Sequence, residues 1–203
     1  MTTLDLSNCY PSILLEESSQ NYFNFYMENE ILNHARLAQG WCAALPACQK
    51  AVAWTFRDSV LARFIVHKQL TSKTFPYDSF IKFLKGFVDD LAIYSTRKGE
   101  NARAIHMLCI EAVFFAVREG GWLVKLEVST FMNDEFVFLG LFWNLKESAS
   151  TVQNDRVKAI LQHRVPRSMP ELASRLATIS YFSSFIPLLK RIAMPLYLSL
   201  IHI

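Results

Sequence analysis

Three aspartates are the residues whose type and setting best suit metal chemistry. Asp89 and Asp90 stand side by side between two apolar runs, residues 83–88 and 91–94, and Asp5 lies in another strand-like run, residues 3–6. Adjacent carboxylates repel one another and resist burial, so a fold that half-buries them needs a compensating cation. Mg²⁺ is suited to that role because it prefers carboxylate, phosphate and water oxygens. A solvated, inert acidic turn is the alternative for the Asp-Asp pair taken by itself.

Asp5 strengthens the metal interpretation. If residues 2–6 and 83–88 form neighbouring strands, Asp5 and Asp89 face one another across the sheet. Three carboxylates at one sheet edge can hold two Mg²⁺ ions about 3.5–4 Å apart, the arrangement used for in-line phosphoryl transfer. One ion would lower the pKa of an attacking hydroxyl, and the other would neutralise charge on the leaving pyrophosphate.

The elements that must position these carboxylates are mostly strands. The two apolar runs around Asp89-Asp90 predict a tight hairpin with an atypical turn, since neither turn residue is Gly. The patterns also predict strands at 2–6, 22–27, 122–128 and 136–143, with a turn at 28–30. Helices are expected at 46–65 and at 102–119, the second ending at Gly120-Gly121.

Beyond Asn144 the pattern predicts helices only. One helix is expected at 155–163, and a second begins with a capping box formed by Ser168 and Glu171. Pro187 and Pro195 are expected to bound a final short helix. The order of elements predicts an α+β fold, a mainly antiparallel sheet with backing helices followed by a helical segment.

Composition excludes several classes of protein. The 203 residues are 52% hydrophobic and 19% charged, with a net charge of +3, so disorder is not expected. The four cysteines form no C-x-x-C pair, which disfavours structural zinc and favours a reducing cytosol. No signal peptide, membrane span, phosphate-binding glycine loop or G-x-S-x-G elbow is present in the sequence.

The ordered set of motifs resembles a known family. Asp5 with Tyr10 five residues on, Leu37-Ala38-Gln39-Gly40, Phe87-Val88-Asp89-Asp90 and Phe138-Leu139-Gly140 occur in the order found in reverse transcriptases of the retrovirus and LTR-retrotransposon Pol type. The segments 155–160 and 171–187 resemble the thumb of these RNA-directed DNA polymerases. The resemblance implies a palm subdomain over residues 1–145, with most of the fingers missing, and a thumb or connection-like helical segment over 146–203.

The resemblance also implies roles for the residues. Asp5 and Asp89 would be the main ligands of two Mg²⁺ ions, with Mn²⁺ as an alternative, and Asp90 a supporting carboxylate. The nucleotide site would be formed by Tyr10 as steric gate, Gln39, Gly40 and Phe87. Phe138, Leu139 and Gly140 would form the primer grip. Nucleic-acid phosphates would be bound by Arg156, Lys158, Arg164 and Arg167. In isolation, a core tyrosine, an ordinary loop and a solvated basic face are the alternatives for these groups.

Some positions depart from the family pattern. Phe87 replaces a Tyr, Ala38 replaces a Pro, and Glu127 and Val128 stand where the fourth palm motif usually carries a Lys, with Lys125 nearby. The expected partners are an RNA or DNA template with primer, a dNTP, and the fingers and ribonuclease H segments of a longer Pol protein. A membrane is not expected as a partner, and the expected location is the cytoplasm, in a retroelement or viral particle.

The expected function is nucleotidyl transfer from a dNTP to a primer 3′-hydroxyl, with weak activity for the chain by itself. Two alternatives stay open. One is a catalytically inactive, domesticated module that binds nucleic acid or protein, which the presence of all three aspartates disfavours. The other is a metal-dependent nuclease that uses the same carboxylates, which the thumb motifs disfavour.

Overall fold

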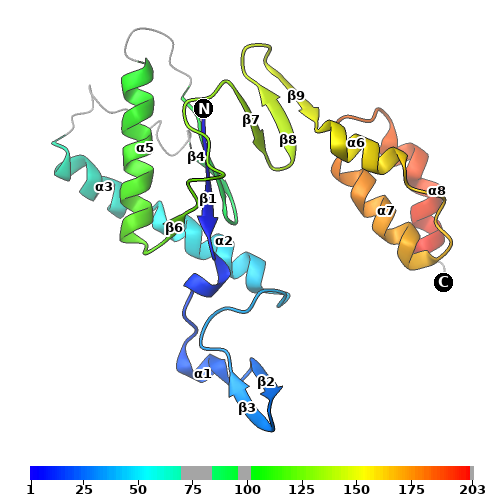
Figure 1. Ribbon diagram of the computed structural model, residues 1–203, viewed down its shortest axis with the longest axis horizontal. Coiled ribbons are helices and arrows are strands. Elements are labelled where there is room, and N and C mark those ends of the chain that lie inside the picture. The colour runs from blue at the N-terminus through cyan, green and yellow to red at the C-terminus, as the bar shows by residue number, and fades with distance from the viewer. Residues whose placement is uncertain (70–83, 96–101, 202–203) are drawn as a thin grey trace. The chain divides into compact units, whose positions relative to one another are not determined.

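The structure is a computed structural model that describes residues 1–69, 84–95 and 102–201. The chain divides into two compact units, Met1–Asn133 and Asp134–Ile203 (Figure 1). Strands and helices occur in both, which confirms the α+β class. The subdomain boundary expected at residue 145 stays a prediction, and the two compact units separate twelve residues earlier.

A four-stranded antiparallel sheet organises the first unit. Its strand order is β4 (Leu84–Phe87), β5 (Asp90–Ile93), β1 (Thr2–Ser7) and β6 (Leu123–Val124). The predicted strand at 2–6 is confirmed, and β1 lies inside the sheet between β5 and β6. The strand predicted at 122–128 is wrong in length: only two residues pair with the end of β1.

Three helices accompany this sheet: α2 (Ala44–Thr55), α3 (Asp58–His67) and α5 (Ala102–Glu119). The helix predicted at 102–119 is confirmed with the same bounds, and its buried stripe enters the core beside Leu4, Leu6 and Leu91. The single helix predicted at 46–65 is two helices, because the chain leaves helical geometry at Phe56 and Arg57.

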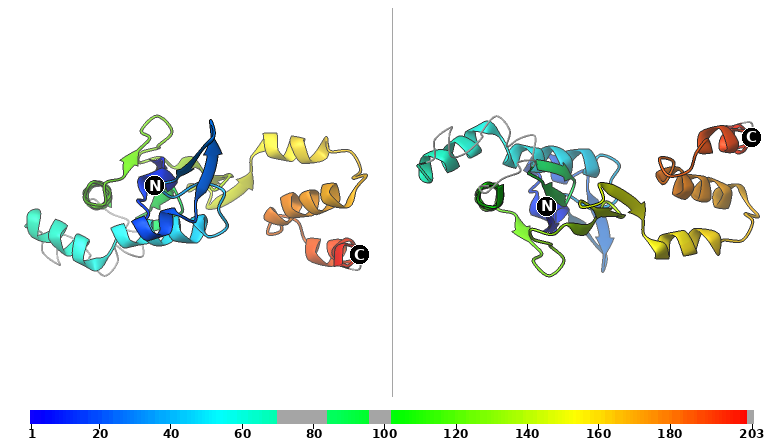
Figure 2. Two further views of the ribbon diagram at one scale, coloured as in Figure 1. Left: turned by 90° about the horizontal axis from the view of Figure 1, so that it is seen from below. Right: turned by 90° about the horizontal axis from the view of Figure 1, so that it is seen from above.

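A smaller hairpin belongs to the same unit. The strands β2 (Asn24–Met27) and β3 (Glu30–Asn33) project away from the four-stranded sheet (Figures 1 and 2). The predicted turn is confirmed: Glu28 and Asn29 join the strands with positive φ angles of 49° and 67°. A short helix, α1 (Glu17–Gln20), and a 3-10 turn, η1 (Tyr10–Ser12), connect β1 to this hairpin.

The second unit begins with a three-stranded antiparallel sheet of β7 (Glu135–Phe138), β8 (Leu141–Asn144) and β9 (Ala149–Val152). The single strand predicted at 136–143 is therefore wrong. Leu139 and Gly140, with φ angles of 50° and 70°, fold it into a hairpin. Two successive residues with positive φ produce a turn whose twist matches that of paired strands.

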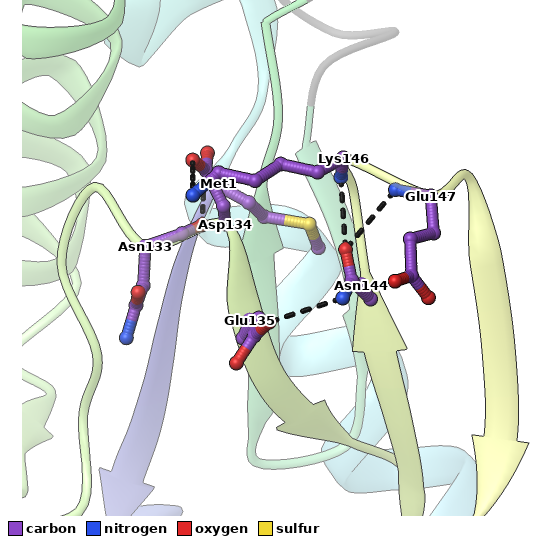
Figure 3. A network of polar contacts seen from close by, with 7 residues as sticks. All are labelled: Met1, Asn133, Asp134, Glu135, Asn144, Lys146 and Glu147. Atoms are coloured by element: carbon purple, nitrogen blue, oxygen red, sulfur yellow. Dashed lines mark hydrogen bonds and ion pairs between the residues drawn. The ribbon is translucent and has the colours of Figure 1, made fainter.

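The expectation of helices alone beyond Asn144 is also wrong, because β9 follows β8. Asn144 explains the reversal (Figure 3). Its Oδ1 accepts the backbone N–H groups of Lys146 and Glu147 at 3.0 and 3.1 Å, and its Nδ2 donates to Glu135 Oε1 at 3.0 Å. A side chain that binds the backbone two and three residues ahead stabilises a turn, so the polar segment returns as a strand.

Three helices complete the unit: α6 (Asn154–Leu161), α7 (Met169–Tyr181) and α8 (Leu189–Ile201). The predicted cap is confirmed, since Ser168 Oγ accepts the backbone N–H of Glu171 at 3.4 Å. The predicted boundary at Pro195 is wrong because this residue lies inside α8. Proline has no backbone N–H, so the carbonyl of Arg191 lacks its usual helical donor. No helix in the described part of the chain is long and apolar enough to span a membrane.

Candidate active site

The turn between β4 and β5 lies one residue earlier than predicted. The first strand ends at Phe87 and the second begins at Asp90, so the turn residues are Val88 and Asp89 rather than Asp89 and Asp90. Val88 is buried and has a φ angle of 57°, which is rare for a β-branched residue. Burial of the Val88 side chain explains the shift. With Val88 in the turn, Asp90 becomes the first residue of β5 and pairs with Phe87. Residue 83 of the predicted first strand lies outside the described residues.

Gln49 of α2 holds this turn, and the sequence patterns did not single it out. Its Oε1 accepts the backbone N–H of Val88 at 2.6 Å, and its Nε2 donates to the carbonyl of Gly86 at 3.4 Å. A strained backbone residue costs about 1–3 kcal/mol and persists only where its surroundings hold it. No residue pattern in the sequence marks Gln49, because the burial of its neighbours Cys48 and Val52 is known only from the structure.

The turn and β1 bring the three aspartates to one end of the sheet. Asp5 and Asp90 are direct partners in the antiparallel pairing of β1 with β5. Directly opposed residues project from the same face, with Cβ atoms about 4.5–5.5 Å apart. The carbonyl of Asp89 accepts the N–H of Leu6 at 2.8 Å, which anchors the turn to β1. The expectation that residues 2–6 and 83–88 form neighbouring strands, with Asp5 facing Asp89, is wrong: β5 lies between β4 and β1, so Asp5 faces Asp90.

The carboxylates affect one another electrostatically. The pKa of Asp90 is raised, first by desolvation and then by the negative charges of Asp89 and Asp5. Like charges that raise a carboxyl pKa mark a position where a cation would be stabilised.

Lys125 supplies a positive charge at this position. Its Nζ lies 2.7 Å from Asp5 Oδ1, and its backbone N–H donates to the carbonyl of Asp5 at 2.9 Å. The contact with Asp5 raises the pKa of Lys125, and Asp89 and Asp90 add to that rise. Lys125 therefore stays protonated and pairs with Asp5 in this structure.

The donors at this end of the sheet fit a hard divalent cation. Asp5, Asp89 and Asp90 offer only oxygen ligands, and desolvation together with the charges of the other two carboxylates raises the pKa of Asp90. Within the residues that the structure describes, however, no group of three or more acidic, His or Cys side chains is gathered closely enough to form a metal site. The three-carboxylate metal site therefore stays a prediction.

Tyr10 belongs to the same neighbourhood. It follows β1 in η1, and its phenol pKa is raised by desolvation and by the nearby Cys48 and Asp89. The negative charge of Asp89 therefore acts on the Tyr10 phenol. Phe87 is 53% exposed beside the turn. Gln39 and Gly40 lie in an exposed loop, where Gly40 has a φ angle of 95°.

A second group of predicted residues meets within the second unit. A Cβ atom on Gly140 would lie 3.0 Å from Arg156 Cζ, so the guanidinium packs against this glycine. Tyr181 of α7 donates its hydroxyl proton to the carbonyl of Leu139, and Trp143 Nε1 donates to that of Phe138 at 3.3 Å. The turn at Leu139-Gly140 is thus tied to α6 and α7.

No protein-family model matches the sequence. The chain is 26% identical over 202 residues to the Gag-Pol polyprotein of avian reticuloendotheliosis virus. That match covers 97% of this chain but only 16% of the viral protein.

Two solved structures have a similar fold. The foamy viral protease-reverse transcriptase in complex with double-stranded DNA aligns with a TM-score of 0.70 and 22% identity, over 97% of this chain and 30% of that chain. The same type of protein in complex with an RNA/DNA hybrid aligns with a TM-score of 0.67 and 22% identity, over 98% of this chain and 23% of that one. The chain has the fold of a reverse transcriptase-type Pol segment.

Within this fold, most of the predicted residues form two described groups. Asp5, Asp89, Asp90, Tyr10 and Phe87 gather at the end of the sheet in the first unit. Phe138, Leu139, Gly140 and Arg156 gather in the second. Three further predicted cations, Lys158, Arg164 and Arg167, are exposed on α6 and in the segment that follows it. Their proposed contacts with nucleic acid stay predictions.

Proposed function

We propose that this chain carries the catalytic residues of an RNA-directed DNA polymerase, which transfers a nucleotide from a dNTP to a primer 3′-hydroxyl. The cross-strand pairing of Asp5 with Asp90, with Asp89 in the adjoining turn, carries the proposal. It brings carboxylates that are far apart in the sequence to one edge of a sheet. The fold of a reverse transcriptase-type Pol segment supports it, as do the nucleic acids named in the similar solved structures.

Asp5 and Asp89 are the proposed main ligands of two Mg²⁺ ions, with Mn²⁺ as an alternative, and Asp90 is the supporting carboxylate. When bound, these ions neutralise charge on the attacking oxygen and on the leaving pyrophosphate. Lys125 would lose its contact with Asp5 when a metal ion binds, because the ammonium group and the ion compete for the same carboxylate oxygen.

The remaining residues position the substrates in this proposal. Tyr10 lies near Asp89 and would exclude a 2′-hydroxyl, whereas Gln39, Gly40 and Phe87 would contact the nucleotide and template. The turn at 138–140 would contact the primer, and Arg156, Lys158, Arg164 and Arg167 would bind phosphates through charge-assisted hydrogen bonds. Catalysis would come mainly from positioning and charge neutralisation.

The chain spans 16% of the viral polyprotein and 23% and 30% of the two reverse transcriptase chains, so their other segments are proposed partners. Fingers and ribonuclease H segments of a longer Pol protein would complete the enzyme. The proposed location is the cytoplasm, within a retroelement or viral particle.

Primer extension tests this function. The 203-residue chain is incubated with an end-labelled primer on an RNA template, dNTPs and Mg²⁺, and incorporation is compared between the unchanged chain and Asp89→Asn. We expect weak incorporation that falls at least about a hundredfold in the variant, because a charge-stabilising group is lost. Asp155→Asn is the matched control, since Asp155 is an exposed carboxylate of the second unit.

Three results would contradict the proposal. Equal incorporation by Asp89→Asn would exclude the carboxylate from catalysis. Binding of primer–template without Mg²⁺-dependent incorporation would instead indicate the catalytically inactive module, and cleavage of the template would indicate a nuclease.

A further inference from the structure

A cavity of about 620 Å³ lies in the first unit and is lined by residues of α2, α3 and the end of α5. Sites that bind small ligands commonly have volumes of about 300–1,000 Å³. None of the residues proposed for catalysis lines it. Its lining includes two tryptophans, Trp54 and Trp122, and three cations, Lys50, Arg57 and Arg63.

Trp54 gives this cavity an accessible aromatic surface. Its side chain is 55% exposed, and the Arg57 guanidinium carbon lies 3.6 Å from the centre of its ring. Arg57 Nε also donates to the carbonyl of Trp54 at 3.1 Å. The cation lies over one face of the indole and restrains it, so a ligand ring would have to stack on the opposite face.

The charge of the lining is positive. Among the lining residues that the structure describes, Glu119 is the one carboxylate, and it pairs with Arg63 at 2.8 Å. Among the residues that the structure describes, no carboxylate forms an ion pair with Lys50 or Arg57. Lys50 and Trp54 are four residues apart on α2, so they lie on the same side of the helix. An anion bound beside Lys50 would therefore lie next to the indole.

The inner wall of the cavity is already formed. Trp122 is buried, and its Nε1 donates to Thr55 Oγ1 at 2.6 Å. A Cβ atom on Gly120 would lie 2.7 Å from Trp122 Cδ1 and 2.9 Å from Thr55 Cγ2. The absence of a side chain at Gly120 thus permits this close packing, and a ligand need not rearrange the wall to bind.

We propose that this cavity binds one nucleotide of a single-stranded nucleic acid. The base stacks on the face of Trp54 opposite Arg57, and the phosphate lies beside Lys50. Aromatic stacking combined with cationic side chains is the usual way in which proteins bind single strands without reading their sequence. The proposal rests on the proposed polymerase function for its biological setting, since a polymerase acts beside a single-stranded template. Its test depends on binding alone.

Fluorescence anisotropy with a labelled oligothymidylate of about 20 nucleotides tests the site on the 203-residue chain. Trp54→Ala should weaken binding about fivefold or more, because the stacking surface is lost. Trp54→Phe should stay within about twofold, because it keeps an aromatic ring. Lys50→Gln should lower the slope of log affinity against log salt by about 0.7, whereas Lys146→Gln in the second unit should leave the slope unchanged.

Circular dichroism confirms that each variant is folded, and Trp54→Phe separates stacking from folding. Unchanged oligothymidylate binding by Trp54→Ala would overturn the proposal. The proposal would also be overturned if polyglutamate displaced the labelled oligothymidylate as well as unlabelled oligothymidylate does, and if Trp54→Ala weakened polyglutamate binding to the same extent. That result would indicate an acidic peptide as the ligand. Asp89→Asn, which tests the polymerase function, should leave this binding unchanged, so failure of one proposal is distinguishable from failure of the other.

Discussion

Val88 and Gln49 show how a strained backbone is held beside the candidate catalytic carboxylates. The buried valine has a left-handed backbone, and its N–H is bound by Gln49 Oε1 at 2.6 Å. Asp89 and Asp90 follow directly, so their placement depends on this turn. Gln49 is a positioning residue, because it reaches the carboxylates only through the backbone.

Gln49→Ala should lower both stability and incorporation. The substitution leaves the partly buried N–H of Val88 without its acceptor, which costs about 1–3 kcal/mol. Gln49→Glu keeps an acceptor oxygen and should recover part of the incorporation. Urea denaturation and primer extension measure the two effects, with exposed Gln162→Ala as control. Normal incorporation in a destabilised Gln49→Ala chain would show that the residue supports the fold alone.

Residue spacing predicted the aspartate cluster but not its neighbours. Strand-like runs around Asp5 and Asp89 were enough to predict that the carboxylates approach one another. Gln49 is 39 residues from Val88 and acts through a backbone N–H, so no residue pattern marks it. The ion pair of Lys125 with Asp5 likewise depends on the pairing of β6 with β1.

At the scale of elements, the hairpin of β7 and β8 is joined to the helices that follow it. Leu139 and Gly140 form its turn, with Arg156 of α6 packed against the glycine and Tyr181 of α7 bound to Leu139. The proposed primer grip and the proposed phosphate-binding cation thus form one local structure.

Gly140→Ala should destabilise this hairpin and its helices more than Gly121→Ala destabilises the first unit. Its φ of 70° disfavours alanine, and the new methyl group would lie 3.0 Å from the Arg156 guanidinium. We expect a loss of about 1–3 kcal/mol from strain and overpacking, with weaker binding of duplex primer–template. Gly121→Ala is the matched control, because its φ is 71° but nothing lies within 4 Å of the added methyl.

Hydrogen exchange during urea denaturation reports the stability of each unit, residues 134–203 for Gly140→Ala and residues 1–133 for Gly121→Ala, and anisotropy reports duplex binding. Equal losses in Gly140→Ala and Gly121→Ala would show that contact with Arg156 contributes nothing beyond the backbone strain.

At the scale of the whole molecule, the two compact units have different buried cores. The first contains His106, which is 4% exposed and shares a 3.0 Å hydrogen bond with Thr2. Burial lowers the pKa of His106 to about 4, with a smaller contribution from the N-terminal ammonium. In the second unit the buried apolar residues are Phe136, Leu176, Phe182 and Ala193.

Acid should therefore destabilise the first unit selectively. The lowered pKa means that unfolded His106 binds a proton at a higher pH than native His106 does. Its contribution is present above the unfolded pKa of about 6.5 and is lost as the pH falls toward 4, by about 2–3 kcal/mol in total.

Urea denaturation between pH 7.5 and 4 measures this loss, with hydrogen exchange assigning it to residues 1–133. His106→Gln should flatten the dependence on pH, and exposed His163→Gln should not. If His106→Gln does not fold, the titration of the His106 ring by NMR decides. A midpoint near 6.5 would contradict the burial argument.

The sequence by itself determined the α+β class, the helix at 102–119, the cap at Ser168 and the strand that contains Asp5. These features depend on local patterning or on strand runs long enough to recognise. Only the tertiary structure decided that Val88 rather than Asp90 enters the turn, that residues 135–152 form three strands, and that Gln49 and Lys125 reach the site. Each of these depends on a contact between distant segments, whose energy outweighs the local preference of the residues involved.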